Sequence, residues 1–232
     1  MEKKKVRVYN GCIKFKGDEI MSKQVALTFD DGPNTTTTLE VLDKLKKYGV
    51  VGSFFLIANE INEQSAESVK KAHAMGCEIA NHTKTHPDMT KLTAEEIKAE
   101  IAYTSEKIYE IVGEHPKFFR PPYILVNDTM VQNIDLPFIC GVGGRDWEPE
   151  VSAEERARLI LENIQDGSII LLHDLLGNDK TVEALDIIIP TLLKEGYECV
   201  TISDLFKNKG VTPTIHSGIV YSNTSDTKPF GA

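Results

Sequence analysis

Apolar and polar positions alternate in a regular way along most of this chain. Seven short apolar runs predict strands covered on both faces, and they lie at residues 24–29, 53–57, 78–81, 118–120, 138–142, 168–172 and 198–201. Between them, apolar residues that recur every three or four positions predict helices at residues 36–48, 65–75, 93–112, 153–164 and 181–195. The third helix opens with a capping box, in which Thr93 and Glu96 satisfy each other's free backbone donors.

The order of these elements predicts an α/β fold. Strands that alternate with helices pair in parallel through right-handed crossovers. Seven such units favour a closed or nearly closed barrel with the helices outside. The alternative is an open doubly wound sheet, but a nucleotide-binding sheet of that kind needs a phosphate loop, and the sequence contains neither G-x-G-x-x-G nor G-K-[ST].

The ends of the chain differ in pattern from its middle, so we place the main domain at residues 23–210. Residues 1–22 are predicted to form an N-terminal extension, with two short alternating stretches around Asn10-Gly11, a favourable hairpin turn. Residues 211–232 are polar and typical of a C-terminal tail or the start of a linker.

Composition mainly excludes classes of partner. The 232 residues carry a formal net charge of −9, which disfavours nucleic acid and anionic membranes because both are polyanions. No apolar run approaches the roughly 20 residues that a membrane helix needs. The four cysteines form no C-x-x-C pair, so a thiolate zinc site is not indicated, and Cys77, Cys140 and Cys199 are expected to be small buried apolar residues.

The start of the chain bears on its location. Its basic residues are not followed by an apolar segment of about 7–15 residues, so no signal peptide is predicted. The protein is then expected in the cytosol, or outside the cell if an export signal has been removed. A monomer is the expectation for its oligomeric state.

Polar side chains collect where the predicted strands end, which is where a parallel barrel carries its functional residues. The first strand ends in Asp30-Asp31-Gly32-Pro33, and adjacent carboxylates are unfavourable there unless a cation holds them, although D-G-P is also good turn chemistry. The third strand ends in N-H-T-K-T-H-P, in which His82 and His86 are spaced to bind one ion. Two imidazoles and the Asp31 carboxylate predict a three-ligand metal site with an open position for water.

Three later strand ends add titratable or aromatic groups. Arg120 is a permanent cation that can bind a carboxylate with two hydrogen bonds, and the prolines after it leave the Tyr123 N–H available. Arg145-Asp146-Trp147 holds the only tryptophan, which is either a core residue or a flat wall against a sugar ring. His173 ends the sixth strand and suits general acid catalysis. The remaining histidines are interpreted as surface or structural residues: His73, His115 and His216.

Five segments now stand in order: T-F-D-D-G-P, N-H-T-K-T-H-P, R-P-P-Y, R-D-W and I-I-L-L-H-D. Together they resemble the five-motif signature of the polysaccharide deacetylases, carbohydrate esterase family 4, over about residues 24–206. The stretches F-F-R-P-P, D-G-S-I-I-L-L-H-D and E-A-L-D-I-I-I-P-T-L are most similar to clostridial acetyl xylan esterases. The resemblance implies a distorted (β/α)7-type barrel, which agrees with the number of predicted strands.

The resemblance also implies roles around a metal ion. It implies that Asp31, His82 and His86 hold one divalent ion, expected to be Zn²⁺, with Co²⁺ or Ni²⁺ as alternatives. It further implies that Asp30 is the general base and that Arg120 orients it.

Other implied roles concern the leaving group and the substrate. Asp146 is expected to tune His173 as the general acid, and the Tyr123 N–H to contribute to an oxyanion hole. Pro122, Tyr123, Trp147 and Leu171 are expected to line the pocket for the acetyl group and the sugar. The family often has an aspartate where this chain has Gly143, so the groove beside Trp147 is expected to differ.

The expected reaction is the metal-dependent removal of O-acetyl groups from acetylated xylan. The first alternative is N-deacetylation of chitin oligomers or peptidoglycan by the same chemistry. Two more distant alternatives are a small-molecule amidohydrolase and a catalytically silent, carbohydrate-binding barrel. The expected partner is therefore an acetylated polysaccharide or oligosaccharide.

Overall fold

The computed structural model describes residues 7–9, 12–14 and 22–231. The main strands start close to the predicted positions, except the last one, which lies in the segment predicted as a C-terminal tail. They are β3 (Lys23–Asp30), β4 (Ser53–Leu56), β5 (Glu78–Asn81), β6 (Phe138–Ile139), β7 (Val142–Gly143), β8 (Ile169–His173), β9 (Tyr197–Cys199) and β10 (Val220–Tyr221). All recorded pairings among these strands are parallel.

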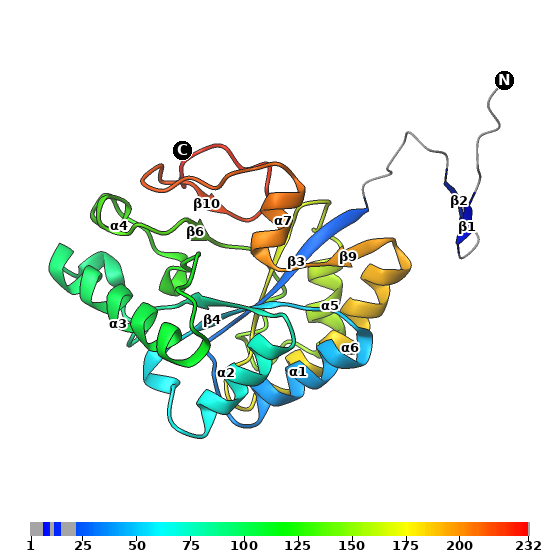
Figure 1. Ribbon diagram of the computed structural model, residues 1–232, viewed down its shortest axis with the longest axis horizontal. Coiled ribbons are helices and arrows are strands. Elements are labelled where there is room, and N and C mark those ends of the chain that lie inside the picture. The colour runs from blue at the N-terminus through cyan, green and yellow to red at the C-terminus, as the bar shows by residue number, and fades with distance from the viewer. Residues whose placement is uncertain (1–6, 10–11, 15–21, 232) are drawn as a thin grey trace.

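Strand β3 lies at the centre of a sheet with the order β5-β4-β3-β8-β7 (Figure 1). Strand β9 pairs with the first residues of β3, whereas β4 pairs with its last residues, so β3 has different partners along its length. Single parallel bridges at Phe119 connect Asn81, at the end of β5, with Phe138 in β6. Because β7 follows β6 directly and pairs with β8, the ring of strands closes into an irregular barrel, which confirms the predicted distorted barrel.

The fourth predicted strand, residues 118–120, forms isolated bridges and no continuous strand. Phe119 forms only the two single bridges, although Arg120 N–H still donates to the Asn81 carbonyl at 3.0 Å. Pro121 and Pro122 follow at once and have no N–H to continue a ladder. The chain turns there into a short 3₁₀ helix, η3 (Pro122–Ile124).

The C-terminal segment differs from the free polar tail that its composition suggested. Strand β10 pairs with β6, and Asn223 forms an antiparallel bridge with Ser168 at the start of β8. The Asn223 side chain is buried and donates to the Ser168 hydroxyl and to the Asp166 carbonyl, both at 3.2 Å. Its polar groups therefore fasten the segment to the barrel instead of pointing into solvent.

The N-terminal extension contains an antiparallel pair, β1 (Arg7–Tyr9) and β2 (Cys12–Lys14). This pairing is the one that a hairpin turn at Asn10-Gly11 predicts. The two turn residues themselves lie outside the described part of the chain.

Helices cover the outside of the barrel. The α-helices are α1 (Thr37–Tyr48), α2 (Ser65–Ala74), α3 (Ala94–Val112), α4 (Asp128–Asn133), α5 (Ala153–Leu161), α6 (Asp179–Lys194) and α7 (Ile202–Asn208), and two further 3₁₀ turns are η1 (Ala58–Glu60) and η2 (Met89–Lys91). The predicted capping box of α3 is present, with Thr93 and Glu96 in reciprocal hydrogen bonds. Helices α4 and α7 were not predicted, because each is shorter than the window in which helical periodicity can be read.

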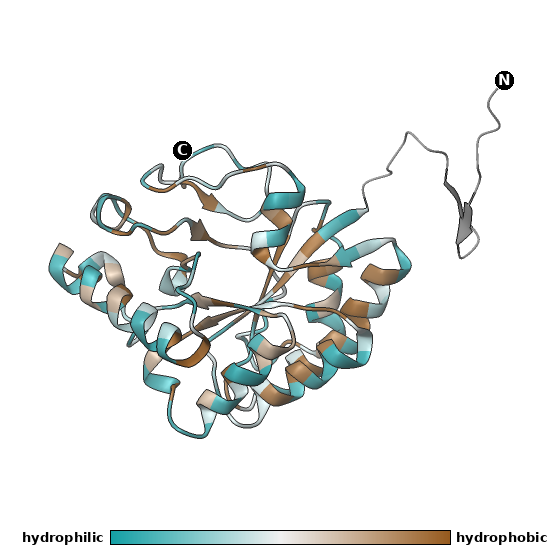
Figure 2. Cartoon of the chain, viewed as in Figure 1, coloured by the Kyte–Doolittle hydropathy of each residue, from teal (hydrophilic) through white to brown (hydrophobic). Residues whose placement is uncertain are grey.

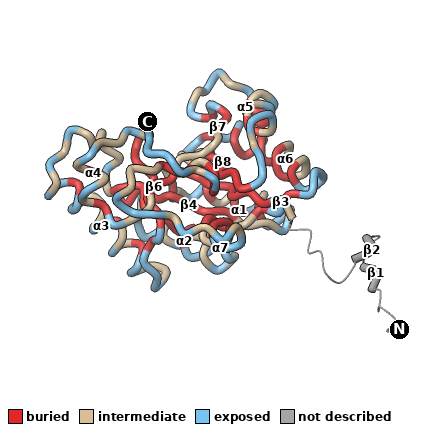
Figure 3. Tube along the Cα trace, turned by 90° about the horizontal axis from the view of Figure 1, so that it is seen from above, coloured by how far each residue is buried: buried red, intermediate tan, exposed pale blue. Residues whose placement is uncertain are grey.

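The hydrophobic core lies between the sheet and the helices. Figure 2 shows apolar residues concentrated on the strands and on the inner faces of the helices, and Figure 3 shows the same regions as buried. Cys77 and Cys199 are buried, as expected, whereas Cys140 is partly buried. Within the described residues, no helix combines the length and the apolar character that crossing a membrane requires.

Candidate active site

The end of β3 places two carboxylates at one end of the barrel. Asp30 is the last residue of the strand and is buried, while Asp31 follows with a positive φ of 72°. This left-handed conformation is strained for a residue with a side chain, and such strain is common at functional sites. The turn directs the two carboxylates to different partners, as expected from the sequence.

The Asp31 carboxylate faces both histidines of the predicted metal site. Its Oδ1 lies 3.4 Å from His82 Nε2 and 3.5 Å from His86 Nε2. One potential ligand atom from each of the three residues lies within 4.8 Å of the other two. Asp31 Oδ1 is buried, and within the described residues it accepts no hydrogen bond, which is unfavourable unless a cation binds there. The donor set and its geometry therefore fit a divalent ion of the zinc type.

Both histidines follow β5 in a loop that α3 holds. Asn81 Oδ1 accepts from the Thr83 N–H at 2.8 Å, and Thr83 Oγ1 accepts from the His86 N–H at 2.9 Å. Glu100 on α3 accepts from the backbone N–H groups of residues 84 and 85, both at 2.8 Å. The loop thereby turns twice, with φ of 72° at Thr83 and 55° at His86. These backbone contacts position the two residues that carry the imidazoles.

Electrostatics prepare the three residues to bind a cation. Burial acts to raise the pKa of Asp31, but the nearby His82 side chain, with the charges of His173 and His86, lowers it below its ordinary value. Burial and the neighbouring His82 lower the pKa of His86. His82 Nδ1 lies 2.7 Å from the Arg120 carbonyl oxygen, so Nδ1 carries the proton and Nε2 is free to bind a metal.

Arg120 is the cation that holds Asp30. It is fully buried, and its Nη1 forms an ion pair with Asp30 Oδ1. Its Nη2 donates to Thr28 Oγ1 at 2.8 Å and to the Cys140 carbonyl at 2.6 Å. The guanidinium also lies over the Phe55 ring, 4.1 Å from its centroid. These contacts fix Asp30 with its Oδ2 directed to the metal site, 3.8 Å from His82 Nε2.

His173, which is partly exposed, and the buried Asp146 form a second pair beside the predicted metal site. His173 Nδ1 lies 2.8 Å from Asp146 Oδ1, and the His173 backbone N–H donates to Asp146 Oδ2 at 2.7 Å. Burial acts to lower the pKa of His173, but the hydrogen bond and charge of Asp146, together with Asp30 and Asp31, raise it to about 9. His173 is therefore positively charged at neutral pH and able to donate a proton from Nε2.

Two exposed aromatic rings stand next to the histidines. The Tyr123 ring packs edge-on against His86, with centroids 4.7 Å apart, and the Trp147 ring packs edge-on against His173 at 5.9 Å. Both residues are more than half exposed, at 64% for Tyr123 and 53% for Trp147. Pro122 and Leu171, by contrast, are buried, so any contact of theirs with substrate would be through a small surface.

Several residues of the site were not found by sequence reasoning. Thr181 Oγ1 donates to Asp146 Oδ2 at 2.9 Å and accepts from Arg156, which also donates to Asn178. These residues lie on or beside helices with no motif of their own, so no local signal marks them. Asp174, directly after His173, is also buried, and burial raises its pKa to about 7 against the hydrogen bond from Thr38, with the charges of Asp30 and Asp31 adding to the rise.

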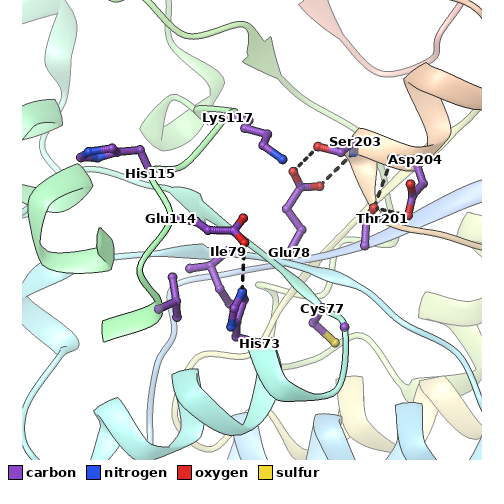
Figure 4. Close-up of a pocket in the computed structure, with 12 residues that line it drawn as sticks. His73, Cys77, Glu78, Ile79, Glu114, His115, Lys117, Thr201, Ser203 and Asp204 are labelled. Atoms are coloured by element: carbon purple, nitrogen blue, oxygen red, sulfur yellow. Dashed lines mark hydrogen bonds and ion pairs between the residues drawn. The ribbon is translucent and has the colours of Figure 1, made fainter. Parts of the chain in front are cut away.

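A separate cavity of about 260 Å³ lies at the beginning of β5, away from the metal ligands that follow its end (Figure 4). There the Glu78 carboxylate accepts from the backbone N–H and the hydroxyl of Ser203 in the first turn of α7. Across the cavity, His73 and Glu114 form an ion pair at 3.8 Å. The contacts of Glu78 satisfy the start of a helix, so we assign them a structural role.

A closed parallel barrel with a candidate three-ligand metal site, an Asp30–Arg120 ion pair and a His173–Asp146 pair at one end is typical of hydrolytic enzymes. The sequence matches the family described as polysaccharide deacetylase over residues 18–136, and the chain belongs to this family. It is 51% identical over 193 residues to a bifunctional xylanase/deacetylase from Pseudobutyrivibrio xylanivorans, a match that covers 83% of this chain and 32% of that protein. The chain thus spans about a third of the length of that curated relative.

Two solved structures are similar in fold and sequence. The Xyl-CE4 domain of a multidomain xylanase from the hindgut metagenome of Trinervitermes trinervoides superposes with a TM-score of 0.86 at 47% identity, over 89% of this chain and 100% of that chain. A family 4 acetyl xylan esterase from Clostridium thermocellum, in complex with a cobalt ion, gives 0.84 at 42% identity, over 88% and 100%.

Proposed function

We propose that the chain hydrolyses O-acetyl groups on acetylated xylan, using one divalent ion held by Asp31, His82 and His86. The observation that carries this proposal is the convergence of these three residues beside an Asp30 carboxylate fixed by Arg120. The choice of substrate is supported by the similarity to proteins named as a xylanase/deacetylase and as an acetyl xylan esterase.

The proposed ion is Zn²⁺, with Co²⁺ or Ni²⁺ as alternatives, because one carboxylate and two imidazoles suit all three. The cobalt ion in the similar esterase structure is consistent with such a site. A bound divalent ion supplies Lewis acidity, which polarises an ester carbonyl and makes water more acidic.

The chain's own residues would then move two protons. Asp30 accepts a proton from the attacking water, since its Oδ1 is held by Arg120 and its Oδ2 faces the metal site. His173, charged because of Asp146, donates a proton to the sugar oxygen as the bond between that oxygen and the acetyl carbon breaks. The products are acetate and a free hydroxyl group. The Tyr123 backbone N–H is proposed to donate to the oxyanion that forms between these steps.

A sugar chain is the proposed occupant of the open side of the site. Trp147 and Tyr123 present large exposed rings beside His173 and His86, and aromatic rings bind the apolar faces of sugars. Pro122 and Leu171 complete this proposed substrate-binding set. A polymer substrate would place the working protein outside the cell or at its surface.

The test is acetate release from acetylated xylan and from acetylated chitooligosaccharides, measured side by side with added Zn²⁺. We expect faster release from xylan, because an alkoxide leaves with less protonation than an amine. Faster release from chitooligosaccharides would replace xylan with an N-acetyl substrate, while no release from either would remove the proposed activity.

The matched control is Asp30→Asn, which keeps the shape of the side chain and removes the base. We expect zinc binding to persist and kcat to fall about 10²–10⁴-fold, the usual contribution of a general base. Near-normal turnover in this variant would exclude Asp30 as the base. The double variant His82→Ala/His86→Ala should contain no metal by elemental analysis.

A further inference from the structure

One fully buried carboxyl group near the site takes no part in the proposed reaction. Asp174 directly follows His173, and its Oδ2 accepts a hydrogen bond from Thr38 Oγ1 at 2.5 Å. Thr38 Oγ1 in turn accepts one from the Asn34 N–H at 2.9 Å. Asp174 Oδ1 accepts none within the described residues. Because burying a carboxyl group is unfavourable, its presence here calls for a specific role.

Asp174 contacts both ends of the segment that carries the two catalytic-site carboxylates. Its backbone N–H donates to the Asp30 carbonyl at 3.0 Å. Its carbonyl accepts from Asn34 Nδ2 at 2.7 Å, and its side chain reaches the Asn34 N–H through Thr38. The turn from Asp30 to Asn34 is therefore attached, at its first and last positions, to the residue that directly follows β8.

The middle of the same turn packs directly on the Asp174 carboxyl group. A Cβ atom built on Gly32 would lie 2.5 Å from Asp174 Oδ2 and 2.8 Å from Oδ1, closer than any side chain tolerates. Gly32 is thus required at this point, and the carboxyl group fills the space that a side chain would occupy. Since Gly32 follows Asp31, the carboxyl group forms the support under the residue with the strained φ of 72°.

We propose that Asp174 is a positioning residue, whose carboxyl group holds the Gly32 turn through Thr38 and thereby directs Asp31 toward His82 and His86. Its effect on catalysis rests on the proposed function, whereas its effect on metal binding rests only on the geometry of the turn. Residues that orient metal ligands in this way typically change metal affinity or activity by about 10–100-fold when replaced.

The experiment measures the Zn²⁺ dissociation constant of the full chain by competition with a coloured chelator, without substrate. Asp174→Ala should weaken zinc binding about 10–100-fold. Asp174→Asn should retain most of the affinity, because the amide keeps the shape and an oxygen that accepts from Thr38. Thr38→Val, which removes only the hydroxyl, should weaken binding in the same direction but less. In acetate release, the alanine variant should lose kcat with little change in KM, since Asp174 does not touch substrate.

The matched control for a purely structural effect is Thr104→Val. Thr104 is also fully buried, and its hydroxyl donates to the Glu100 carbonyl within α3 at 3.0 Å. We expect a comparable loss of thermal stability in Thr104→Val and Thr38→Val, but a change in zinc affinity only in Thr38→Val. If Asp174→Ala does not fold, this pair of valine variants carries the test.

The proposal is overturned if Asp174→Ala and Thr38→Val bind zinc as tightly as the unmodified chain, or if Asp174→Asn is as weak as Asp174→Ala. A chain that shows the zinc effects but releases no acetate would lose the proposed function and keep the positioning role. If all variants release acetate normally and bind zinc with unchanged affinity, the positioning role is lost and the proposed function is kept.

Discussion

Two arginine side chains are fully buried in this barrel, and they are held in opposite ways. Arg120 contacts a charge directly, through its ion pair with Asp30. Among the described residues, Arg156 donates its hydrogen bonds to neutral oxygen atoms, which belong to Val151, Glu148, Asn178 and Thr181. Burial lowers the pKa of the Arg156 guanidinium, and the negative charges of Asp146 and Glu183 oppose this.

The comparison shows two ways in which a buried cation can serve an active site. Arg120 fixes Asp30, the proposed base, directly, so losing Arg120 leaves an uncompensated charge in the interior. Arg156 acts indirectly. It donates to Thr181, Thr181 donates to Asp146, and Asp146 holds His173. The first arrangement should be sensitive to any substitution, and the second should be more tolerant.

The largest expected effect is that of Arg120→Met. It leaves the Asp30 carboxylate buried without a partner, which typically destabilises a protein by about 3–5 kcal/mol, and it should abolish acetate release. Urea unfolding measures the loss. The double variant Asp30→Asn/Arg120→Met should recover part of the stability, because it removes the unpaired charge. Unfolding of Arg120→Met at the same urea concentration as the parent chain would contradict the direct ion pair.

The next largest effect is expected for Asp146→Asn, which removes the negative charge from the His173–Asp146 pair. Against the effect of burial, Asp146, with Asp30 and Asp31, raises the pKa of His173 from 6.5 to about 9, so the stabilising effect of the protonated ring is full below about pH 6.5 and is lost as pH rises through about 9. Without the Asp146 charge its pKa should fall back toward 6.5. At pH 8 the protonated fraction then drops roughly 30-fold, and kcat should drop with it. Titration of the His173 ring by NMR checks the pKa, and an unmoved value would exclude Asp146 as its cause.

Arg156→Met tests the indirect arrangement. It leaves neutral acceptors without donors, which costs about 1–3 kcal/mol, and it loosens Asp146 without exposing a buried charge. We therefore expect a smaller loss of stability than in Arg120→Met and only a few-fold lower kcat. A loss as large as that of Arg120→Met would show that the two arginines are equivalent.

The smallest expected effect lies on the surface between α1 and α6, where Asp186 accepts from Lys44, Lys47 and Tyr48. These hydrogen bonds lower the pKa of Asp186. The contribution of Asp186 to the stability of the fold is therefore present above pH 3.8 and is lost as pH falls below that value. Solvent screens this exposed cluster, so Asp186→Asn should reduce stability by only about 0.2–1 kcal/mol, less in high salt, with acetate release unchanged.

Much of the barrel and the contacts between its charged groups could be predicted from the sequence. Apolar runs identify strands, and parallel strands bring their ends together, so residues as distant as Asp31 and His86 were expected to meet, as they do. The pairs of Arg120 with Asp30 and of Asp146 with His173 were expected from the resemblance and are present as contacts. Their catalytic roles remain predictions.

The contacts made by neutral groups could not be predicted. Thr181 reaches Asp146 across 35 residues through one hydroxyl, and a threonine in a helix gives no sign of such a bond. Asp30-Asp31-Gly32-Pro33 was interpreted partly as turn chemistry, yet Gly32 is needed because the Asp174 carboxyl group packs against it. The contacts of the polar C-terminal segment could not be predicted for a related reason: the Asn223 side chain donates to the Asp166 carbonyl and the Ser168 hydroxyl of the barrel.

The position of the C-terminal segment has an architectural consequence. Asn223 bonds to Ser168 at the start of β8, and Phe230 N–H donates to the Gly218 carbonyl just before β10, so both contacts lie where strands begin. Ser22 lies directly before the start of β3. Ser22 and the segment around Phe230 therefore both lie at the floor of the barrel, and neither lies across the mouth that carries Asp31, His82 and His86.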